Sequence, residues 1–130
     1  MYSTFPHLKP PSISVSIPVE DDFEVRFPQM LGDLRDLDHA DAFLVGIPFD
    51  GGTVGGRPGS RLAPREIRAS FIASRTYEPH LRIDISEFPK VVDAGDVSVA
   101  YTDVQTTIER ARTVLTHMLR RPGGSHSNGR

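Results

Sequence analysis

Two short apolar runs, separated by a segment in which neither helix nor strand can persist, decide most about what this chain can fold into. The runs span residues 41–48 and 90–97. The first is short and almost continuously apolar, which is typical of a strand buried on both faces in a parallel sheet, and the second predicts another short strand. Pro48 is expected to end the first strand, because a central strand needs each backbone N–H, and Gly95 to mark the end of the second.

The segment between residues 49 and 63 contains five glycines and Pro58. Glycine and proline at this density exclude a helix, so the segment predicts a long loop leaving the C-terminal end of the first strand. Ligands gather at that end of open α/β sheets, and loops of this length in compact domains are usually functional or disordered.

Helical periodicity occurs before the first strand and after each strand. Residues 27–37 predict a short helix or turn, Pro64 suits the first turn of the next helix, and a third helix runs from Asp103 to about Arg121 behind a capping box of Thr102 and Gln105. The second helix is expected to face inward with Ile67, Phe71 and Ile72 and outward with Arg65, Glu66 and Arg68. The inner stripe expected on the third helix is Val104, Ile108, Ala111, Leu115 and Met118. Strand, helix, strand, helix is the order of an α/β fold.

The ends of the chain differ in composition from its middle. Residues 1–26 hold four prolines among serines, which predicts an extended or disordered segment. Residues 122–130 are polar and glycine-rich and predict an irregular tail. The α/β domain is therefore expected to span residues 27–121.

Charge and composition exclude several classes of function. The formal net charge of -2 carries no basic excess that would favour nucleic acid or an anionic membrane. The absence of cysteine excludes disulfides and thiolate metal sites. No apolar run approaches the roughly 20 residues of a membrane span, and the N-terminus has no signal-like pattern, so a cytoplasmic location is expected by default.

Three stretches, in order and at fitting separations, resemble the ureohydrolases, the arginase and agmatinase family. They are VGIPFD at residues 45–50, the loop and helix start from GGT at residue 51 through RPGSR to PREIR at 64–68, and YEP at 77–79 followed by VVDAGDV at 91–97. The pattern is closer to agmatinases and guanidino-acid hydrolases than to true arginases. The resemblance implies the N-terminal portion of a three-layer αβα arginase-like fold with a parallel sheet, in incomplete form.

The resemblance also implies a chemistry. Two manganese ions would share a bridging hydroxide that attacks the guanidinium carbon, releasing urea and an amine, for example putrescine from agmatine. The implied partners are a small guanidino substrate and further copies of the chain in a homo-oligomer. The loop residues that the resemblance places near the active-site mouth or at a subunit contact are Asp50, Gly51, Gly52, Arg57, Pro58, Gly59 and Arg61.

The metal ligands of the family are mostly missing from this sequence. Family members follow the helix with a buried strand ending in Gly-Gly-Asp-His-Ser, whose histidine binds metal. Here Gly-Gly-Ser-His-Ser at 123–127 follows the helix almost at once, which leaves His126 as the one candidate ligand. The Asp-Ala-His-x-Asp and Asp-x-Asp motifs are absent, so no catalytic residue is identified. We therefore expect weak or no activity from the chain alone, and poor stability from exposed strand edges.

The carboxylates and arginines allow more than one interpretation. Asp50, Asp93 and Asp96 fit a catalytic carboxylate pair or, as we favour, structural acceptors of backbone amides at strand ends, with Gly95 between the last two. Arg57, Arg61, Arg65 and Arg68 fit an anion site or, more simply, loop-anchoring or intersubunit ion pairs. Two other classes of function stay open: a non-catalytic remnant that binds full-length ureohydrolase subunits, and a small nucleotide-binding module.

Overall fold

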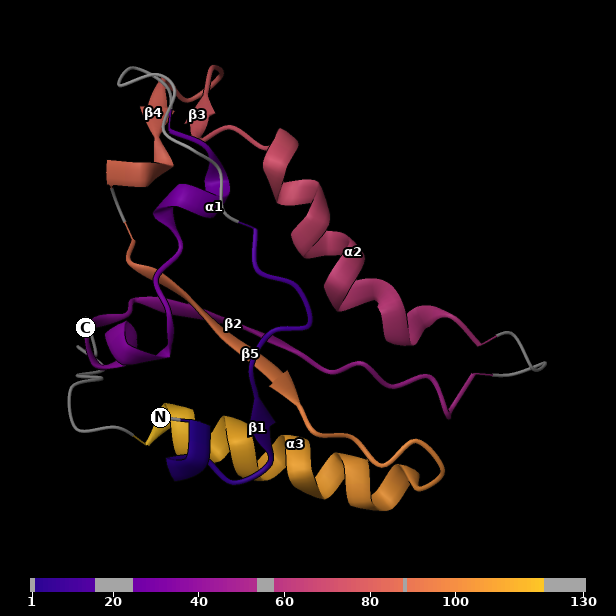
Figure 1. Ribbon diagram of the computed structural model, residues 1–130. Coiled ribbons are helices and arrows are strands. Elements are labelled where there is room, and N and C mark those ends of the chain that lie inside the picture. Colours follow the sequence, from indigo (N-terminus) through magenta and orange to yellow (C-terminus); the bar gives the residue numbers. More distant parts are fainter. Residues whose placement is uncertain (1, 16–24, 54–57, 88, 121–130) are drawn as a thin grey trace, which may run out of the picture.

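The computed structural model describes residues 2–15, 25–53, 58–87 and 89–120 (Figure 1). Its strands and helices are β1 (Leu8–Lys9), α1 (Phe27–Met30), β2 (Ala42–Gly46), α2 (Ala63–Ser70), β3 (Tyr77–Glu78), β4 (Ile83–Asp84), β5 (Val91–Val97) and α3 (Val104–Leu119). Short 3-10 turns span Tyr2–Thr4, Leu34–His39, Ser60–Leu62, Phe71–Ala73 and Ile85–Glu87. Within the described ranges no helix has the length and apolar character needed to cross a membrane.

A three-stranded sheet with the order β1-β5-β2 organises the molecule. β2 and β5 are parallel, whereas β1 is antiparallel to β5. The predicted α/β class with a parallel pair is thus confirmed. Leu8 of β1 is buried, so the proline-rich N-terminal segment contributes an edge strand that its composition did not reveal.

A β-bulge interrupts the pairing of β5 with β2. Leu44 lies opposite Asp93 and Gly46 opposite Asp96, so β5 has one more residue than β2 over the same interval. Gly95 lies in this bulge with φ of 91°. The prediction that Gly95 marks the end of the strand is therefore wrong, because the strand absorbs the extra residue and continues to Val97.

The prediction that the first strand is buried on both faces is also wrong. Phe43, Leu44 and Val45 are half-buried, and Ile47 just beyond the strand is 42% exposed. The reason is that β5 is the one strand paired with β2 in the part of the chain described, so the other edge of β2 is open.

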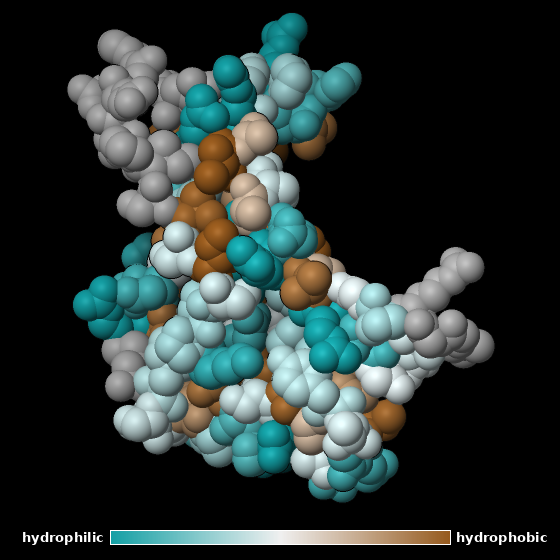
Figure 2. All heavy atoms as spheres, turned by 45° about the vertical axis from the view of Figure 1, so that its right-hand side comes forward, coloured by the Kyte–Doolittle hydropathy of each residue, from teal (hydrophilic) through white to brown (hydrophobic). Residues whose placement is uncertain are grey.

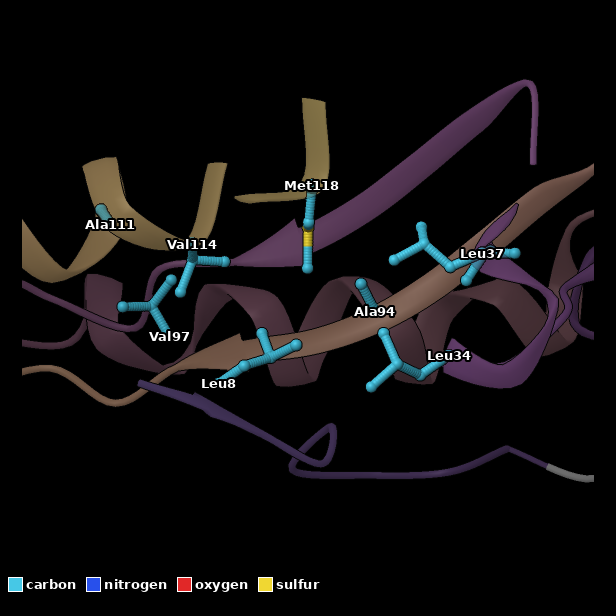
Figure 3. Packing of buried hydrophobic residues seen from close by; sticks show 9 residues of the cluster. Leu8, Leu34, Leu37, Ala94, Val97, Ala111, Val114 and Met118 are labelled. Carbon is cyan, nitrogen blue, oxygen red and sulfur yellow. The ribbon is translucent and has the colours of Figure 1, made fainter. Parts of the chain in front are cut away.

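The hydrophobic core lies between β5 and α3. Figure 3 shows the side chains of α3 directed toward β5, with those of β1 and the Leu34–His39 turn packed beside them. The buried residues are Leu8, Leu34, Leu37, Val92, Ala94, Val97, Ala111, Val114 and Met118. Because successive side chains of a strand alternate between faces, Val92 and Ala94 point into this core while Asp93 points to the opposite face.

The cap of α3 is Asp103, so the prediction of a capping box by Thr102 and Gln105 is wrong. The Asp103 carboxylate accepts the Thr106 N–H at 3.1 Å and the Thr106 hydroxyl at 2.6 Å. One carboxylate satisfies two groups of the first turn, which a threonine one residue earlier cannot reach.

Replacing Asp103 with alanine is expected to raise the unfolding equilibrium constant about fivefold, the usual effect of losing a helix N-cap. Urea denaturation followed by circular dichroism measures it. Thr102→Ala is the matched control and should leave the urea midpoint unchanged. A larger effect at Thr102 than at Asp103 would restore the capping box predicted from the sequence.

The buried stripe of α3 also differs from the predicted one. Val104 and Ile108 are 46% and 55% exposed, whereas Thr107 and Val114 are buried. The Thr107 hydroxyl accepts the Ala100 N–H and donates to the Ala100 carbonyl oxygen, both at 3.0 Å. A threonine whose hydroxyl is hydrogen-bonded can be buried. Hydrophobicity alone therefore predicted the wrong residues for the first part of the buried stripe.

The predicted orientation of α2 is confirmed only in part, because Arg65 and Glu66 are exposed as expected whereas three other residues lie on the side opposite to the predicted one. Ile67 and Ile72 are 55% and 48% exposed, although both were expected to face inward. Arg68, expected to face outward, is only 6% exposed. Figure 2 brings the side of α2 forward and shows hydrophobic residues among hydrophilic ones on this surface. The cause is a pair of carboxylates on β5 that attracts the arginine inward.

Candidate functional site

The candidate site lies where β2 and β5 end. Because the two strands are parallel, both C-terminal ends meet at one edge of the sheet. Two connections begin there, the glycine-rich loop after β2 and the turn between β5 and α3. This edge is therefore where the structure brings together residues distant in sequence.

Asp50 anchors the glycine-rich loop. Its side chain is 1% exposed, and one carboxylate oxygen accepts the Gly59 N–H at 2.8 Å. The Arg61 guanidinium binds the same carboxylate through Nε at 2.8 Å and Nη2 at 2.6 Å. These contacts hold residues 59 and 61 beside residue 50, so the end of the loop lies next to its beginning. We call this arrangement the Asp50 latch.

The turn after β5 supports the latch from the other side. The Arg61 guanidinium lies over the Tyr101 ring, 4.8 Å from its centroid, in a cation–π contact. Near the start of the loop, the Thr53 hydroxyl and N–H both donate to the Asp50 carbonyl oxygen, at 2.7 and 3.1 Å. The latch thus connects the ends of both parallel strands.

The latch keeps Asp50 ionised. The Arg61 side chain first, and then the Gly59 amide, hold the pKa of Asp50 well below its usual range. A carboxylate in this state is a poor proton acceptor at neutral pH. Asp50 is therefore suited to orienting the loop and not to general base catalysis.

The latch makes a pH-dependent contribution to stability. Because the pKa of Asp50 is lower in the folded chain than in the unfolded one, the contribution is full above the unfolded value of about 3.9 and falls as the pH drops toward the folded pKa. The urea midpoint of the wild type should therefore exceed that of Asp50→Asn by a constant amount from pH 5 to 7. The difference should shrink progressively below about pH 4. Arg61→Gln should remove much of this pH dependence of the urea midpoint. A difference between the wild type and Asp50→Asn that grows as the pH falls would contradict the latch.

A second cluster joins α2 to the opposite face of β5 from the core. Arg68 donates through Nε and Nη2 to Asp93, at 2.7 and 2.9 Å, and through Nη1 to Asp96 at 2.8 Å. Nη2 also donates to the Gly95 carbonyl oxygen at 3.1 Å. The three side chains are 7%, 15% and 1% exposed for Arg68, Asp93 and Asp96. We call this the Arg68 clamp.

Backbone amides complete the clamp. Asp93 accepts the Gly95 N–H at 3.0 Å, and Asp96 accepts the Ser12 N–H at 3.3 Å. A methyl group on Gly46 would overlap the Asp96 carboxylate and lie 2.9 Å from Pro64, so β2 and α2 leave room for the clamp only with glycine there. The carboxylates accept backbone amides as the structural interpretation supposed, and an arginine that was placed on the solvent side binds them as well.

A cavity of about 480 Å³ opens beside the clamp. Tyr2, Arg68 and Asp93 line it together with prolines from the N-terminal segment and from α1. Burial first, and then the charge of Asp93, raise the pKa of the Tyr2 phenol. The phenol is therefore neutral at physiological pH, and two of the charged groups that line the cavity, Arg68 and Asp93, are already paired with each other in the clamp.

The described carboxylates do not fit a dinuclear metal site. No group of three or more His, Asp or Glu side chains arranged to hold a metal ion occurs in the described ranges. Asp50 is held by Arg61, and Asp93 and Asp96 by Arg68, so a cation at any of them would compete with a guanidinium. The candidate ligand His126 and the tail at 122–130 lie outside the described residues, as does Arg57.

Sequence reasoning grouped some of these residues and missed others. Asp50, Gly59 and Arg61 come together as neighbours in one loop, and Gly51, Gly52 and Pro58 are exposed parts of it. Tyr101 was not predicted, and its position after a strand gave no signal of a guanidinium contact. The contact of the Ser12 amide with Asp96 was also not predicted, because 84 residues separate the two.

Comparison with known proteins shows which proteins this chain is similar to, which the geometry alone does not show. A family model described as "Arginase family" matches residues 40–127. The agmatinase of Bacillus subtilis is 33% identical over 95 residues, which cover 68% of this chain and 32% of the relative. The agmatinase of Pyrococcus horikoshii is 36% identical over 101 residues, which cover 71% and 34% respectively. A human mitochondrial guanidino acid hydrolase is 36% identical over 70 residues, 54% of this chain and 20% of the relative. The chain thus spans about a third or less of the length of these relatives.

Proposed function

Because this chain belongs to the arginase family, we propose that it forms part of an agmatinase-type ureohydrolase, which hydrolyses a guanidino group to urea and an amine. The observation that carries the proposal is the match to proteins named for guanidino substrates, which are agmatinases, a guanidinobutyrase and guanidino acid hydrolases. The substrate class is therefore a linear guanidino compound such as agmatine.

In this proposal the chain supplies the loop at the mouth of the site. The residues concerned are Asp50, Gly51, Gly52, Pro58, Gly59 and Arg61, with Arg57 in the same loop. A guanidino substrate is a cation, so an unpaired arginine at the mouth would repel it. Pairing with Asp50 neutralises Arg61 and lets it hold the loop without that repulsion.

The chain's described residues are not assigned a step of the reaction. The resemblance implies two manganese ions, whereas the described carboxylates are occupied by arginines and form no ligand cluster. The role proposed for them is positioning: the Asp50 latch fixes the loop, and the Arg68 clamp fixes the strand end and helix behind it.

The purified chain, supplied with Mn²⁺ and agmatine, is expected to release no urea above the rate without protein. The reason is that its described residues offer no set of ligands to activate water. A colorimetric urea assay at several protein concentrations measures this, with Bacillus subtilis agmatinase as the positive control. Urea release that scales with the chain and stops on adding chelator would show a working site and overturn the expectation.

A second candidate function is binding to ureohydrolase subunits without catalysis. Open β2, together with exposed Ile47 and Ile67 beside it, favours this role because apolar groups at a strand edge are normally covered. The two candidates are separable, since one requires urea release from an assembly containing the chain and the other requires assembly alone. Bound nucleotide in the purified chain would instead favour the nucleotide-binding alternative.

A further inference from the structure

The segment of residues 2–15 lies across the end of β5 that forms the Arg68 clamp, and we call it the strap. Figure 1 shows it in indigo, running from α3 past β5 towards α1. Its β1 part pairs with β5 through two residues, with Leu8 opposite Val97 and Lys9 opposite Asp96. β2, by contrast, pairs with β5 along its whole length. The strap is therefore attached to the sheet over a short distance.

Hydrogen bonds hold the strap on either side of this pairing. The Ser98 N–H donates to the His7 carbonyl oxygen at 2.8 Å, and the Ser12 N–H donates to the Asp96 carboxylate at 3.3 Å. The second bond is longer than a typical N–H···O hydrogen bond. It joins the strap directly to the clamp, because Asp96 is one of the two carboxylates that Arg68 binds.

The strap buries little apolar surface. Leu8 is the one buried side chain among residues 2–15, whereas Tyr2 and Phe5 are half-buried against the core. The other residues of the buried cluster come from β5, α3 and the turn before β2. Segments with few buried apolar contacts open at a lower free energy than the core of the same domain. We therefore expect the strap to open before the core does.

One residue of the strap has an unfavourable backbone conformation. His7 is exposed and has a φ of 63°. The left-handed region is unfavourable for residues with a side chain and accessible to glycine. Docking the strap against β5 holds His7 in this conformation, and opening releases it. The strain therefore favours the open strap.

The strap also forms part of the wall of the cavity beside the clamp. The residues that it contributes are Tyr2, Pro10, Pro11, Ile13, Ser14 and Val15. The rest of the lining, which includes Arg68 and Asp93, comes from later parts of the chain. A movement of the strap away from β5 therefore opens the cavity and brings solvent to the clamp.

We propose that the strap is a lid over the Arg68 clamp, and that it opens as a unit while the sheet of β2 and β5 and the helix α3 stay folded. When it opens, the cavity joins the solvent and Asp96 loses the Ser12 amide. An ion pair weakens when water replaces surroundings of low dielectric constant, so the clamp is stronger with the strap closed than with it open. The position of the strap thus controls how firmly α2 is held against β5. This device is separate from urea release and does not depend on it.

Hydrogen exchange of the full chain, followed by NMR at low urea concentrations, tests whether the strap opens independently. The amides of Ser12 and Ser98 report on the strap, and the amide of Val114 in α3 reports on the core. We expect the two strap amides to exchange with an opening constant at least tenfold larger than that of Val114. Their exchange should also depend less on urea, because opening the strap exposes less surface than unfolding the chain.

Two glycine variants test the role of His7. His7→Gly should slow the exchange of the Ser98 amide about two- to fivefold, because glycine tolerates the left-handed conformation of the closed strap. Arg82→Gly is the matched control. Arg82 is also exposed and has a φ of 54°, but it lies in the β3–β4 turn. This variant should leave the exchange of Ser98 unchanged, because that turn does not take part in opening the strap.

Leu8→Ala tests whether opening uncovers the clamp. Loss of the buried Leu8 side chain should accelerate the exchange of the Ser98 amide at least tenfold. The Nε proton of Arg68, which is donated to Asp93, should exchange faster in parallel. Circular dichroism establishes that this variant folds. The comparison of His7→Gly with Arg82→Gly uses no destabilising substitution, so it decides the question even where Leu8→Ala unfolds.

Three results would overturn the lid. The first is exchange of the strap amides with the same opening constant and urea dependence as Val114, since the strap would then open only when the whole chain unfolds. The second is an equal effect of His7→Gly and Arg82→Gly on the Ser98 amide. The third is acceleration of Ser98 in Leu8→Ala without any change at the Arg68 Nε proton, which would mean that the strap opens without uncovering the clamp.

Discussion

Replacing Arg68 with methionine is expected to lower the free energy of unfolding by about 3–5 kcal/mol, the usual loss when one partner of a buried ion pair is removed. Methionine fills a similar volume but leaves Asp93 and Asp96 buried without their cation. The two carboxylates, both on β5, would then repel each other, and α2 would lose the ion pairs that hold it against β5. Urea denaturation followed by circular dichroism measures the loss.

Two variants separate the charge effect from general damage. Arg65→Met changes an exposed arginine on the same helix and should move the urea midpoint little. The triple variant with Arg68→Met, Asp93→Asn and Asp96→Asn removes all three charges, so it should recover a large part of the loss. Equal destabilisation by Arg65→Met and Arg68→Met would show that the clamp contributes nothing specific. A triple variant less stable than the single one would show that the amide contacts of the carboxylates dominate.

Replacing Gly95 with alanine is expected to cost about 2–5 kcal/mol, from backbone strain together with overpacking. The φ of 91° is unfavourable for any residue with a side chain. The added methyl would also overlap the Lys9 carbonyl oxygen and lie 3.2 Å from the Tyr2 ring. We expect β1 to detach, which hydrogen exchange should detect as loss of protection in the β1–β5 pairing, together with a lower urea midpoint.

Gly52→Ala is the matched control for Gly95→Ala. A methyl group there meets no atom of the described residues within 4 Å, so stability should change by less than about 0.5 kcal/mol. If the two variants proved equally stable, β1 would not be held against the bulge in the way described.

The sequence was sufficient to predict the elements whose signal is local. The runs at 41–48 and 90–97 predicted two strands and Pro64 the start of a helix, and the structure has all three. The glycine-rich segment predicted a loop, and its described residues form no α-helix or strand before α2 begins at Ala63. Asp50 as an acceptor of backbone amides was also predictable, because its partner Gly59 lies in the same loop.

Features that depend on distant partners were not predictable. Arg68 faces inward because two carboxylates 25 and 28 residues later offer it a buried partner, and no periodicity rule contains that information. The exposure of Ile67 follows from the same rotation of the helix. Leu8 enters the core because β1 pairs with β5, a contact spanning most of the chain. In each case a specific tertiary interaction overrode the hydrophobic pattern.

The β-bulge at Gly95 has a consequence for how the chain tolerates mutation. In a regular strand Asp93 and Asp96 would point to opposite faces, and only the extra residue lets one arginine reach both. Gly46 leaves the space for Asp96, and Gly95 supplies the backbone conformation. A substitution at any one of these positions prevents Arg68 from binding both carboxylates, so the remaining residues no longer stabilise the clamp. Their mutational effects should therefore be strongly epistatic, and an evolutionary path that alters the clamp must change several of these residues together or replace its charges as a set.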